Sequence, residues 1–329
     1  MRNLKIDFYR GVAIFLMVYA HILQFGKCIF NAFMSGQGLN SFIYSFHMPI
    51  LAIISGYCCA LSIQKYTCNL KKYIINRSLS LLSVILVWGT IYFLLDFIFI
   101  KPTISLSYLI FRYFTGQLWF ITGIIFLNVI TIIIYHFCNK NKFASWVMIY
   151  SLVTVSFFVM ALFIPHINPI CYLMPFYFIG FLYNAPSSYH FKMTINKIAP
   201  FGVIIFIILF FTFGFNLALE NNNVYCYFYK ACCCCIFVLL LNNIYYHFQN
   251  SKIITFFITC GKYSIQIYTM HWIIILYALK EYELKTYSEM AIFQILVSPV
   301  FSITICALII ILSKLVLKKQ KLSRLLFGR

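Results

Sequence analysis

Three ionisable side chains, Asp7, Arg10 and His21, stand in the N-terminal apolar run KIDFYRGVAIFLMVYAH. Ionisable groups in a run that enters a membrane are expensive and mark functional sites by default. Arg10 and His21 are eleven positions apart, which is about 16 Å of helical rise and close to three turns, so they share one helix face. Asp7 precedes Arg10 by one helical turn and can pair with its guanidinium. The spacing predicts a fixed cation at one membrane boundary and an imidazole near the bilayer centre.

These side chains suit two complementary tasks. The unperturbed imidazole titrates near neutral pH and can take a proton from a hydroxyl. The guanidinium keeps its charge and binds phosphate through a bidentate fork. An arginine at a membrane boundary also serves as a topology and snorkelling residue. We therefore expect His21 to act in catalysis, whereas Arg10 alone leaves both interpretations open.

Two more histidines are expected at a comparable depth, His47 in SFHMPILAIISGY and His271 in GKYSIQIYTMHW. A single membrane histidine can simply hydrogen-bond a neighbouring helix. Three mid-depth histidines in a chain that has 7 in all are harder to explain by packing. We include His47 and His271 among the candidate catalytic residues, with helix packing as the alternative for each.

A basic cluster, Lys71, Lys72 and Arg77, opens the third expected span in KKYIINRSLSLL. Such a cluster is usually a solvated span end facing lipid headgroups. Here it is expected on the same cytoplasmic side as Arg10, so the four cations together can bind a polyphosphate. The 13 cysteines, in contrast, lie mostly in apolar runs without the flanking histidines or paired CxxC spacing of a metal site. We expect no metal.

The composition indicates an integral membrane protein. Hydrophobic residues make up 63% of the chain and charged residues 9%, whereas soluble domains carry about 25% charged residues. The chain has 25 lysines and arginines against 6 acids. These cations lie in short loops between apolar runs, and no basic stripe with interleaved aromatics appears, so we expect no nucleic-acid partner.

Hydropathy predicts an all-α, polytopic protein with about ten transmembrane helices of roughly 20 residues each. The expected spans are 8–26, 41–63, 77–100, 117–138, 145–164, 168–184, 198–218, 224–243, 262–279 and 290–316. With both termini in the cytoplasm, every lysine and arginine falls inside except Lys27, Lys101, Arg112, Lys230, Lys280 and Lys285. The positive-inside rule favours this orientation. Residues 1–329 are expected to form a single membrane-embedded domain with no appended soluble domain.

Several of these segments resemble acyltransferase family 3, the multi-span membrane acyltransferases of bacterial surface glycans and related acceptors. The resemblance begins with Asp7, Arg10 and His21 and continues through FHMP at 46–49 and SGY at 55–57. It extends to Arg77, to LWF at 118–120 and to GKYSIQIYTMH at 261–271. The ten-span layout is similar to that family over essentially the whole chain.

This resemblance implies transfer of an acyl group, commonly acetyl from cytoplasmic acetyl-CoA, to a hydroxyl of a surface polysaccharide or lipid-linked glycan. It implies a bacterial cytoplasmic membrane, and Arg10 and His21 as the central pair. His21 then acts as general base or carries the acyl group as an acyl-imidazole, and the sequence leaves both routes open. His271 or His47 would polarise the thioester carbonyl or hold the acceptor.

A second function remains open at this stage. A transporter or flippase for a glycan intermediate would also need polar groups inside the membrane. The chain shows no inverted repeat and few buried acids for ion coupling, which favours the acyltransferase. The oligomeric state, the acyl group and the acceptor are not indicated by the sequence.

Overall fold

The computed structural model describes residues 3–29, 39–65, 70–99, 105–137, 143–163, 168–184, 224–278 and 297–318, with single positions between 193 and 208 and near the C-terminus. Within these ranges every regular element is a helix, so the expected all-α class is confirmed there. The α-helices of the first half are α1 (Leu4–Ile29), α2 (Leu39–Tyr44), α3 (His47–Lys65), α4 (Leu70–Phe99), α5 (Leu106–Ile110), α6 (Trp119–Phe137), α7 (Phe143–Phe163) and α8 (Asn168–Tyr183). Those of the second half are α11 (Val224–Phe248), α12 (Lys252–Lys262), α13 (Ser264–Ile273) and α14 (Ser298–Leu317), and two π-helical turns, η2 (Phe111–Thr115) and η4 (Ile274–Ala278), follow α5 and α13.

Five helical segments in the described ranges are long and apolar enough to cross a membrane. They are Leu4–Leu23, Phe42–Lys65, Ile75–Phe99, Cys226–Phe248 and Ser298–Val316, each within or overlapping an expected span. The bent pair Tyr108–Phe114 and Trp119–Tyr135 raises the number to 6 if it forms one span. Shorter apolar helices occupy Val147–Met160, Ile170–Tyr183 and Ser264–Leu276, where spans were also expected. The expected span 198–218 lies largely outside the described residues, so the number ten and the orientation stay predictions.

The chain divides into two compact units, which we describe separately. The first unit combines Met1–Leu51 with Asn196–Leu315, and the second combines Ala52–Ile195 with Val316–Arg329. The first unit therefore contains α1, α2, the start of α3 and the helices α11 to α14. The second contains the rest of α3 and the helices α4 to α8.

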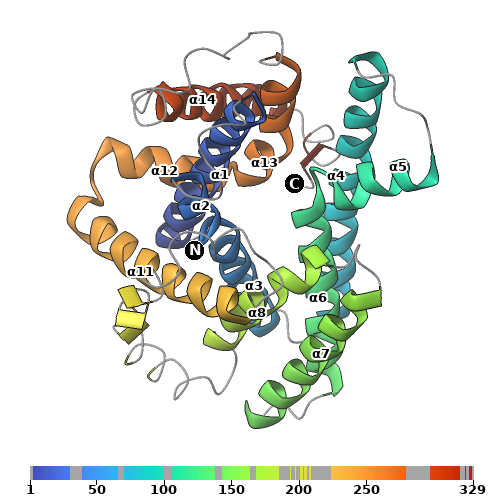
Figure 1. The fold of residues 1–329 in the computed structure, drawn as a ribbon, viewed down its shortest axis with the longest axis vertical. Helices are drawn as coiled ribbons and strands as arrows, with labels where there is room; N and C mark the ends of the chain where they lie inside the picture. The colour runs from blue at the N-terminus through green and yellow to red at the C-terminus, as the bar shows by residue number, and fades with distance from the viewer. Residues whose placement is uncertain are drawn as a thin grey trace. The chain divides into compact units, whose positions relative to one another are not determined.

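Helix α1 lies against α12 and α13 in the first unit (Figure 1). Two glycines allow the backbones of α1 and α12 to approach closely. A Cβ on Gly11 would lie 1.7 Å from the carbonyl oxygen of Phe257, and a Cβ on Gly261 would lie 1.8 Å from that of Asp7. Small residues at crossing points are the usual way for membrane helices to gain close packing. This double contact fixes how far α1 is shifted along α12.

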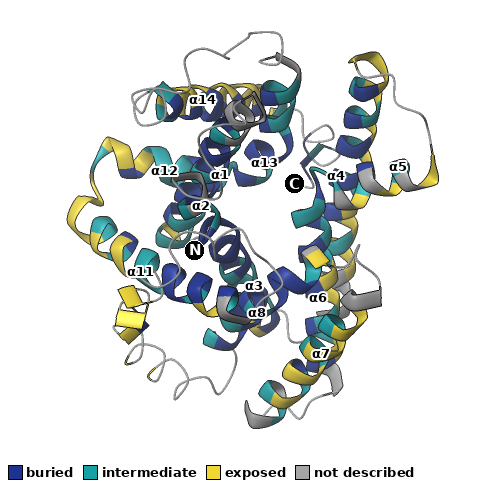
Figure 2. Cartoon of the chain, in the orientation of Figure 1, coloured by how far each residue is buried: buried dark blue, intermediate teal, exposed yellow. Residues whose placement is uncertain are grey.

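Aromatic and aliphatic side chains fill the space around α1. Phe8 and Val12 form a buried cluster with Leu241 of α11 and Ile254 of α12. The ring of Phe257 meets the ring of Phe8 edge-on at 6.2 Å between centroids. Figure 2 shows α1 as mostly buried, whereas exposed residues mark one side of α11 and α14. In a membrane these exposed apolar side chains face lipid, so their exposure needs no protein partner.

In the second unit, too, glycines at helix crossings allow close backbone packing. A Cβ on Gly56 of α3 would lie 1.9 Å from the carbonyl oxygen of Tyr177, and one on Gly180 of α8 would lie 1.9 Å from that of Ile53. Tyr177 also donates its hydroxyl to the Oδ1 atom of Asn128 in α6 at 2.6 Å. Close backbone contact and buried hydrogen bonds between helices thus hold α3, α6 and α8 together.

Candidate active site

The part of the candidate site nearest the start of α1 is the pair Asp7 and Arg10. Their side chains form the predicted ion pair, with 3.6 Å between Asp7 Oδ1 and Arg10 Nη1. The Asp7 side chain is 3% exposed and that of Arg10 is 25% exposed. The aspartate is thus buried in the protein, while the Arg10 side chain stays partly exposed. This arrangement suits an arginine that is oriented from one side and binds phosphate on the other.

His21 lies farther along the same helix, which runs without a break from Leu4 to Ile29. The uninterrupted helix keeps the rise of about 16 Å from Arg10 to His21 that the spacing predicts. His21 is half-buried. Its Nδ1 atom lies 2.9 Å from Nε2 of His271, and the two rings are inclined by only 7°. The indole of Trp272 lies beside the His21 ring at 4.3 Å between centroids.

His47, the first residue of α3, joins the same group. Its side chain is fully buried, and its Nδ1 atom lies 2.7 Å from the carbonyl oxygen of Ile43. The ring of Tyr44 lies near both histidines, with its centroid 4.9 Å from that of His47 and 6.3 Å from that of His21. We refer to His21, His47 and His271 as the histidine cluster.

The histidine cluster contains a buried nitrogen without a hydrogen-bond partner among the described residues, Nε2 of His47. A buried polar atom without a partner costs about 1–3 kcal/mol. Such atoms in a site are the places where a ligand or an ordered water supplies the missing bond.

Lys230 is a functional candidate that the sequence analysis missed. The charge count placed it outside the membrane, but its side chain is 1% exposed within α11 and acts electrostatically on His47. The count treated it as a loop charge because it lies close to the end of an apolar run, and its assignment to the outer side stays a prediction. Its position inside the run 224–243 was the available signal, since a cation within a span is a functional hypothesis by default.

The predicted phosphate-binding cations are only partly described. Arg77 lies in α4 with an exposed side chain and belongs to the second unit, whereas Arg10 belongs to the first. The side chains of Lys71 and Lys72 lie outside the described residues. A shared phosphate site of these four cations therefore stays a prediction.

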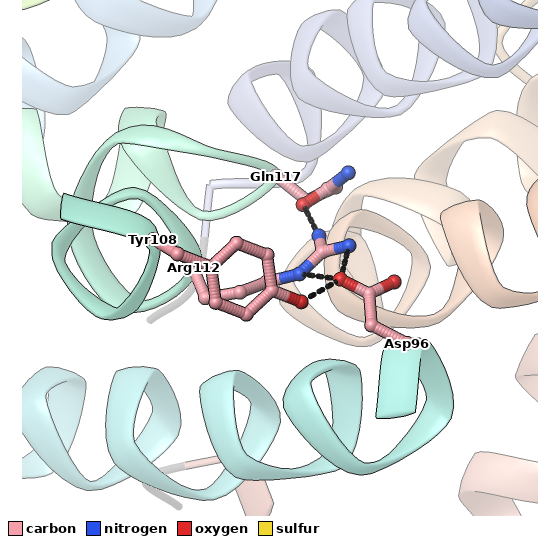
Figure 3. Close-up of polar contacts among 4 residues, drawn as sticks. All are labelled: Asp96, Tyr108, Arg112 and Gln117. Atoms are coloured by element: carbon pink, nitrogen blue, oxygen red, sulfur yellow. Dashed lines mark hydrogen bonds and ion pairs between the residues drawn. The ribbon is translucent and has the colours of Figure 1, made fainter. Parts of the chain in front are cut away.

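A second buried polar group lies in the second unit and was also missed. The Arg112 guanidinium in η2 donates to the Asp96 carboxylate and to Oε1 of Gln117, and the Tyr108 hydroxyl donates to Asp96 (Figure 3). The side chains of Asp96 and Arg112 are only 2% and 6% exposed. The charge count placed Arg112 among the cations of the outer side. Each charge in this network has partners from other helical turns, so it is suited to holding the bent segment around η2 in place.

The first unit thus combines the imidazoles of the histidine cluster, a partly exposed arginine and a buried ammonium. The imidazole suits proton transfer from a hydroxyl or attack on an activated carbonyl. The guanidinium suits a phosphate-bearing substrate. This combination is suited to group transfer from a phosphate-bearing donor.

Comparison with known proteins agrees with this chemistry. The model of acyltransferase family 3, described as an acyltransferase domain, matches residues 3–314. Nodulation protein NolL of Mesorhizobium japonicum is 29% identical over 204 residues, which cover 57% of this chain and 49% of that protein. The match thus spans about half the length of that relative. No solved structure matches the chain. Because the family model covers nearly the whole sequence, including Asp7, Arg10 and all of the histidine cluster, the chain belongs to acyltransferase family 3.

Proposed function

We propose that this protein transfers an acyl group, acetyl from cytoplasmic acetyl-CoA, to a hydroxyl of a surface polysaccharide or lipid-linked glycan at the bacterial cytoplasmic membrane. One observation carries the proposal beyond the family. His21 and Arg10 lie on the same unbroken helix, α1. The His21 imidazole contacts His271 of α13, and the Arg10 guanidinium is paired with Asp7. A base and a phosphate-binding cation therefore stand on one rigid element.

Arg10 binds phosphate oxygens of the CoA moiety in this mechanism. Asp7 orients the guanidinium, and Lys71, Lys72 and Arg77 add positive charge at the cytoplasmic side. The pantetheine arm then extends toward His21, over about the 16 Å of helix that separates the two residues. This placement brings the thioester carbonyl to the histidine cluster. Binding energy from the remote phosphates thereby positions the reacting group.

His21 carries the chemistry by one of two routes. As a general base, it takes the proton of the acceptor hydroxyl while that oxygen attacks the thioester carbonyl. The C–S bond then breaks, and the leaving thiolate recovers the proton from the imidazolium. In the covalent route, His21 attacks the carbonyl itself, the C–S bond breaks, and CoA leaves as the thiolate. The acyl-imidazolium then passes its acyl group to the acceptor hydroxyl, whose proton goes to the thiolate. Both routes yield the ester and free CoA.

The direct test uses membrane vesicles that hold the full chain and acetyl-CoA labelled in its acetyl group. We expect label to enter membrane-bound carbohydrate, and His21→Ala to abolish this incorporation. The control is His247→Ala, which replaces an exposed histidine at the end of α11 and should keep full activity. Normal incorporation by a folded His21→Ala chain would refute the role of His21, and no consumption of acetyl-CoA by the wild type would favour a flippase.

Two further measurements test the donor and the acceptor. Arg10→Lys should raise the KM for acetyl-CoA by about 10-fold or more, because a charged bidentate hydrogen bond is lost. An unchanged KM would exclude phosphate recognition by Arg10. Mass spectrometry of surface polysaccharides from cells with and without the gene should show the loss of one acyl mass. That mass identifies the acyl group.

A further inference from the structure

The protonation states of His271 and His21 follow from the partners of their ring nitrogens. Nδ1 of His271 lies 2.9 Å from the carbonyl oxygen of Ile267. A carbonyl oxygen only accepts hydrogen bonds, so Nδ1 of His271 must carry a proton. His271 is fully buried, and a buried charge without a counter-ion is expensive, which favours the neutral ring. Its Nε2 atom therefore presents a lone pair.

That lone pair determines the state of His21. Nδ1 of His21 is 2.9 Å from Nε2 of His271. Since Nε2 of His271 accepts, Nδ1 of His21 must donate, and the His21 proton is on Nδ1. Nε2 of the neutral His21 ring is then the nitrogen with the free lone pair.

We infer that His271 is a positioning residue that holds His21 as the Nδ1–H tautomer and directs the His21 Nε2 lone pair to the substrates. This inference rests on the proposed function and assigns the reacting nitrogen within it. Both routes described above use the same atom. It removes the hydroxyl proton in the general-base route and forms the acyl bond in the covalent route.

The ring geometry supports positioning as well as protonation. The planes of His21 and His271 are inclined by 7°, and Trp272 packs beside His21 at 4.3 Å between centroids. The hydrogen bond and the indole together restrict rotation of the His21 ring. When His21 gains a proton or an acyl group it becomes cationic, and its Nδ1–H bond to His271 becomes charge-assisted and stronger. Support that strengthens as the reaction proceeds favours the transition state over the ground state.

The role expected for His271 from the sequence was to polarise the thioester carbonyl or hold the acceptor. Each of its two ring nitrogens is already engaged, Nδ1 with Ile267 and Nε2 with His21. Its only N–H points to the protein backbone. Positioning therefore fits these contacts better than direct contact with the substrate.

His47 gives an internal comparison. Its Nδ1 atom also donates to the carbonyl oxygen one turn earlier, that of Ile43 at 2.7 Å. Its buried Nε2 atom, unlike that of His271, has no partner among the described residues. The same kind of bond to a backbone carbonyl thus sets the Nδ1–H tautomer in both rings. Of the two, only His271 then accepts a hydrogen bond from another imidazole, that of His21.

The test compares three His271 variants in the full chain, in vesicles with labelled acetyl-CoA. His271→Gln places an amide oxygen close to the position of Nε2 and keeps an acceptor for His21. His271→Asn carries the same group on a shorter side chain that does not reach His21, and His271→Leu has no acceptor. Thr269→Ser is the control on the same helix, because its hydroxyl donates to carbonyls of its own helix.

We expect His271→Gln to keep the rate at saturating acetyl-CoA within about 10-fold, and His271→Asn and His271→Leu to lose about 10²- to 10⁴-fold. The KM for acetyl-CoA should stay unchanged in all three, because Arg10 is untouched. The pH profile of His271→Gln should match that of the wild type, since glutamine accepts a hydrogen bond but cannot titrate.

Two outcomes would overturn the inference. If His271→Gln is as inactive as His271→Leu, or its pH profile shifts, His271 exchanges a proton itself. If His271→Asn and His271→Leu both react at the wild-type rate, His21 needs no positioning. Either result leaves the proposed function intact as long as the wild type transfers the label and His21→Ala does not. A wild type that transfers no label would refute the proposed function instead.

Discussion

Buried charges in this protein occur in two different settings. Asp96 and Arg112 satisfy each other, with Tyr108 and Gln117 completing the network. Lys230 is buried beside the histidine cluster and acts on His47, where a polar nitrogen is still open. A satisfied network rigidifies a fold, whereas a cation next to an open acceptor marks a place for a ligand. The first group is therefore suited to a structural role, whereas Lys230 is a candidate for the site because it is a buried cation near the histidine cluster.

The structural role of Asp96 and Arg112 leads to a prediction about pairs of substitutions. Arg112→Met leaves a buried carboxylate without its cation, which should lower the free energy of unfolding by about 3–5 kcal/mol. The double variant Asp96→Leu with Arg112→Met removes both charges and should recover most of this loss. Thermal unfolding of the purified chain in detergent, followed by the reactivity of its buried cysteine thiols, measures both.

A different ranking would contradict this interpretation. If the double variant is less stable than Arg112→Met alone, the Asp96 carboxylate stabilises the unit through its other partners. A thermal midpoint of Arg112→Met equal to that of the wild type would show that the ion pair contributes nothing. The matched control is Arg77→Met, which removes an exposed arginine of α4 and should leave the midpoint unchanged.

At the scale of elements, the position of α1 against α12 decides whether the site forms. His21 and His271 are 250 positions apart in the sequence, so their contact depends on how α1 packs against α12 and against α13, which follows α12 and carries His271. Gly11 and Gly261 set this packing because each lies close to the backbone of the other helix. A Cβ added to Gly11 would lie 1.7 Å from the carbonyl oxygen of Phe257, and one added to Gly261 would lie 1.8 Å from that of Asp7. Both glycine contacts involve the part of α1 that is near Asp7. A shift there would be transmitted along the rigid helix to His21.

We therefore predict that Gly11→Ala and Gly261→Ala impair acyl transfer more than they impair folding. The added methyl group forces the helices apart and should destabilise the chain by about 1–3 kcal/mol. A displacement of about 1 Å at the reacting groups can lower the rate on the order of 100-fold. The transfer rate at saturating acetyl-CoA and the thermal midpoint are measured on the same preparations.

The control for this prediction is Gly202→Ala. Its Cβ would lie 3.6 Å from Cβ of Cys235, an ordinary van der Waals contact, so activity and stability should both stay at the wild-type level. Full activity of Gly11→Ala and Gly261→Ala would show that the spacing of α1 and α12 does not set the geometry of the histidine cluster.

These elements also explain which parts of the site were predictable from the sequence. Asp7, Arg10 and His21 lie on one helix, where spacing alone fixes their relative positions. The sequence also indicated His47 and His271, because imidazole is rare and costly inside a membrane. The pairing of His21 with His271 was not predictable, because it depends on two glycine contacts between distant helices. Lys230 was missed because hydropathy treats a lysine close to a span end as a loop residue.

At the scale of the whole molecule, hydropathy predicted the positions of the membrane helices that the structure describes, and the number ten stays a prediction. The long expected spans 8–26, 41–63 and 77–100 correspond to α1, α3 and α4. The expected span 262–279 is instead the short helix α13 followed by η4, and it begins after a separate helix α12. Apolar content reveals that a segment is buried or in lipid, but a break such as the one at Tyr263 depends on local capping.

The buried cations sharpen the predicted orientation. Of the six cations assigned to the outer side, Arg112 and Lys230 are buried and do not act as loop charges. Only Lys27, Lys101, Lys280 and Lys285 then remain on that side. The positive-inside bias toward a cytoplasmic N-terminus is therefore stronger than the simple count suggests.

Reporter fusions at loop positions test this orientation. Green fluorescent protein fused after Lys142 should fluoresce, because that loop is expected in the cytoplasm, whereas alkaline phosphatase fused after Lys285 should be active outside it. Exchanging the two reporters should silence both, which controls for expression. The reverse pattern would place Arg10 at the outer face, where cytoplasmic acetyl-CoA does not reach it. Arg10 could then not bind the CoA phosphates, and the donor would have to approach the histidine cluster from the opposite side of the membrane.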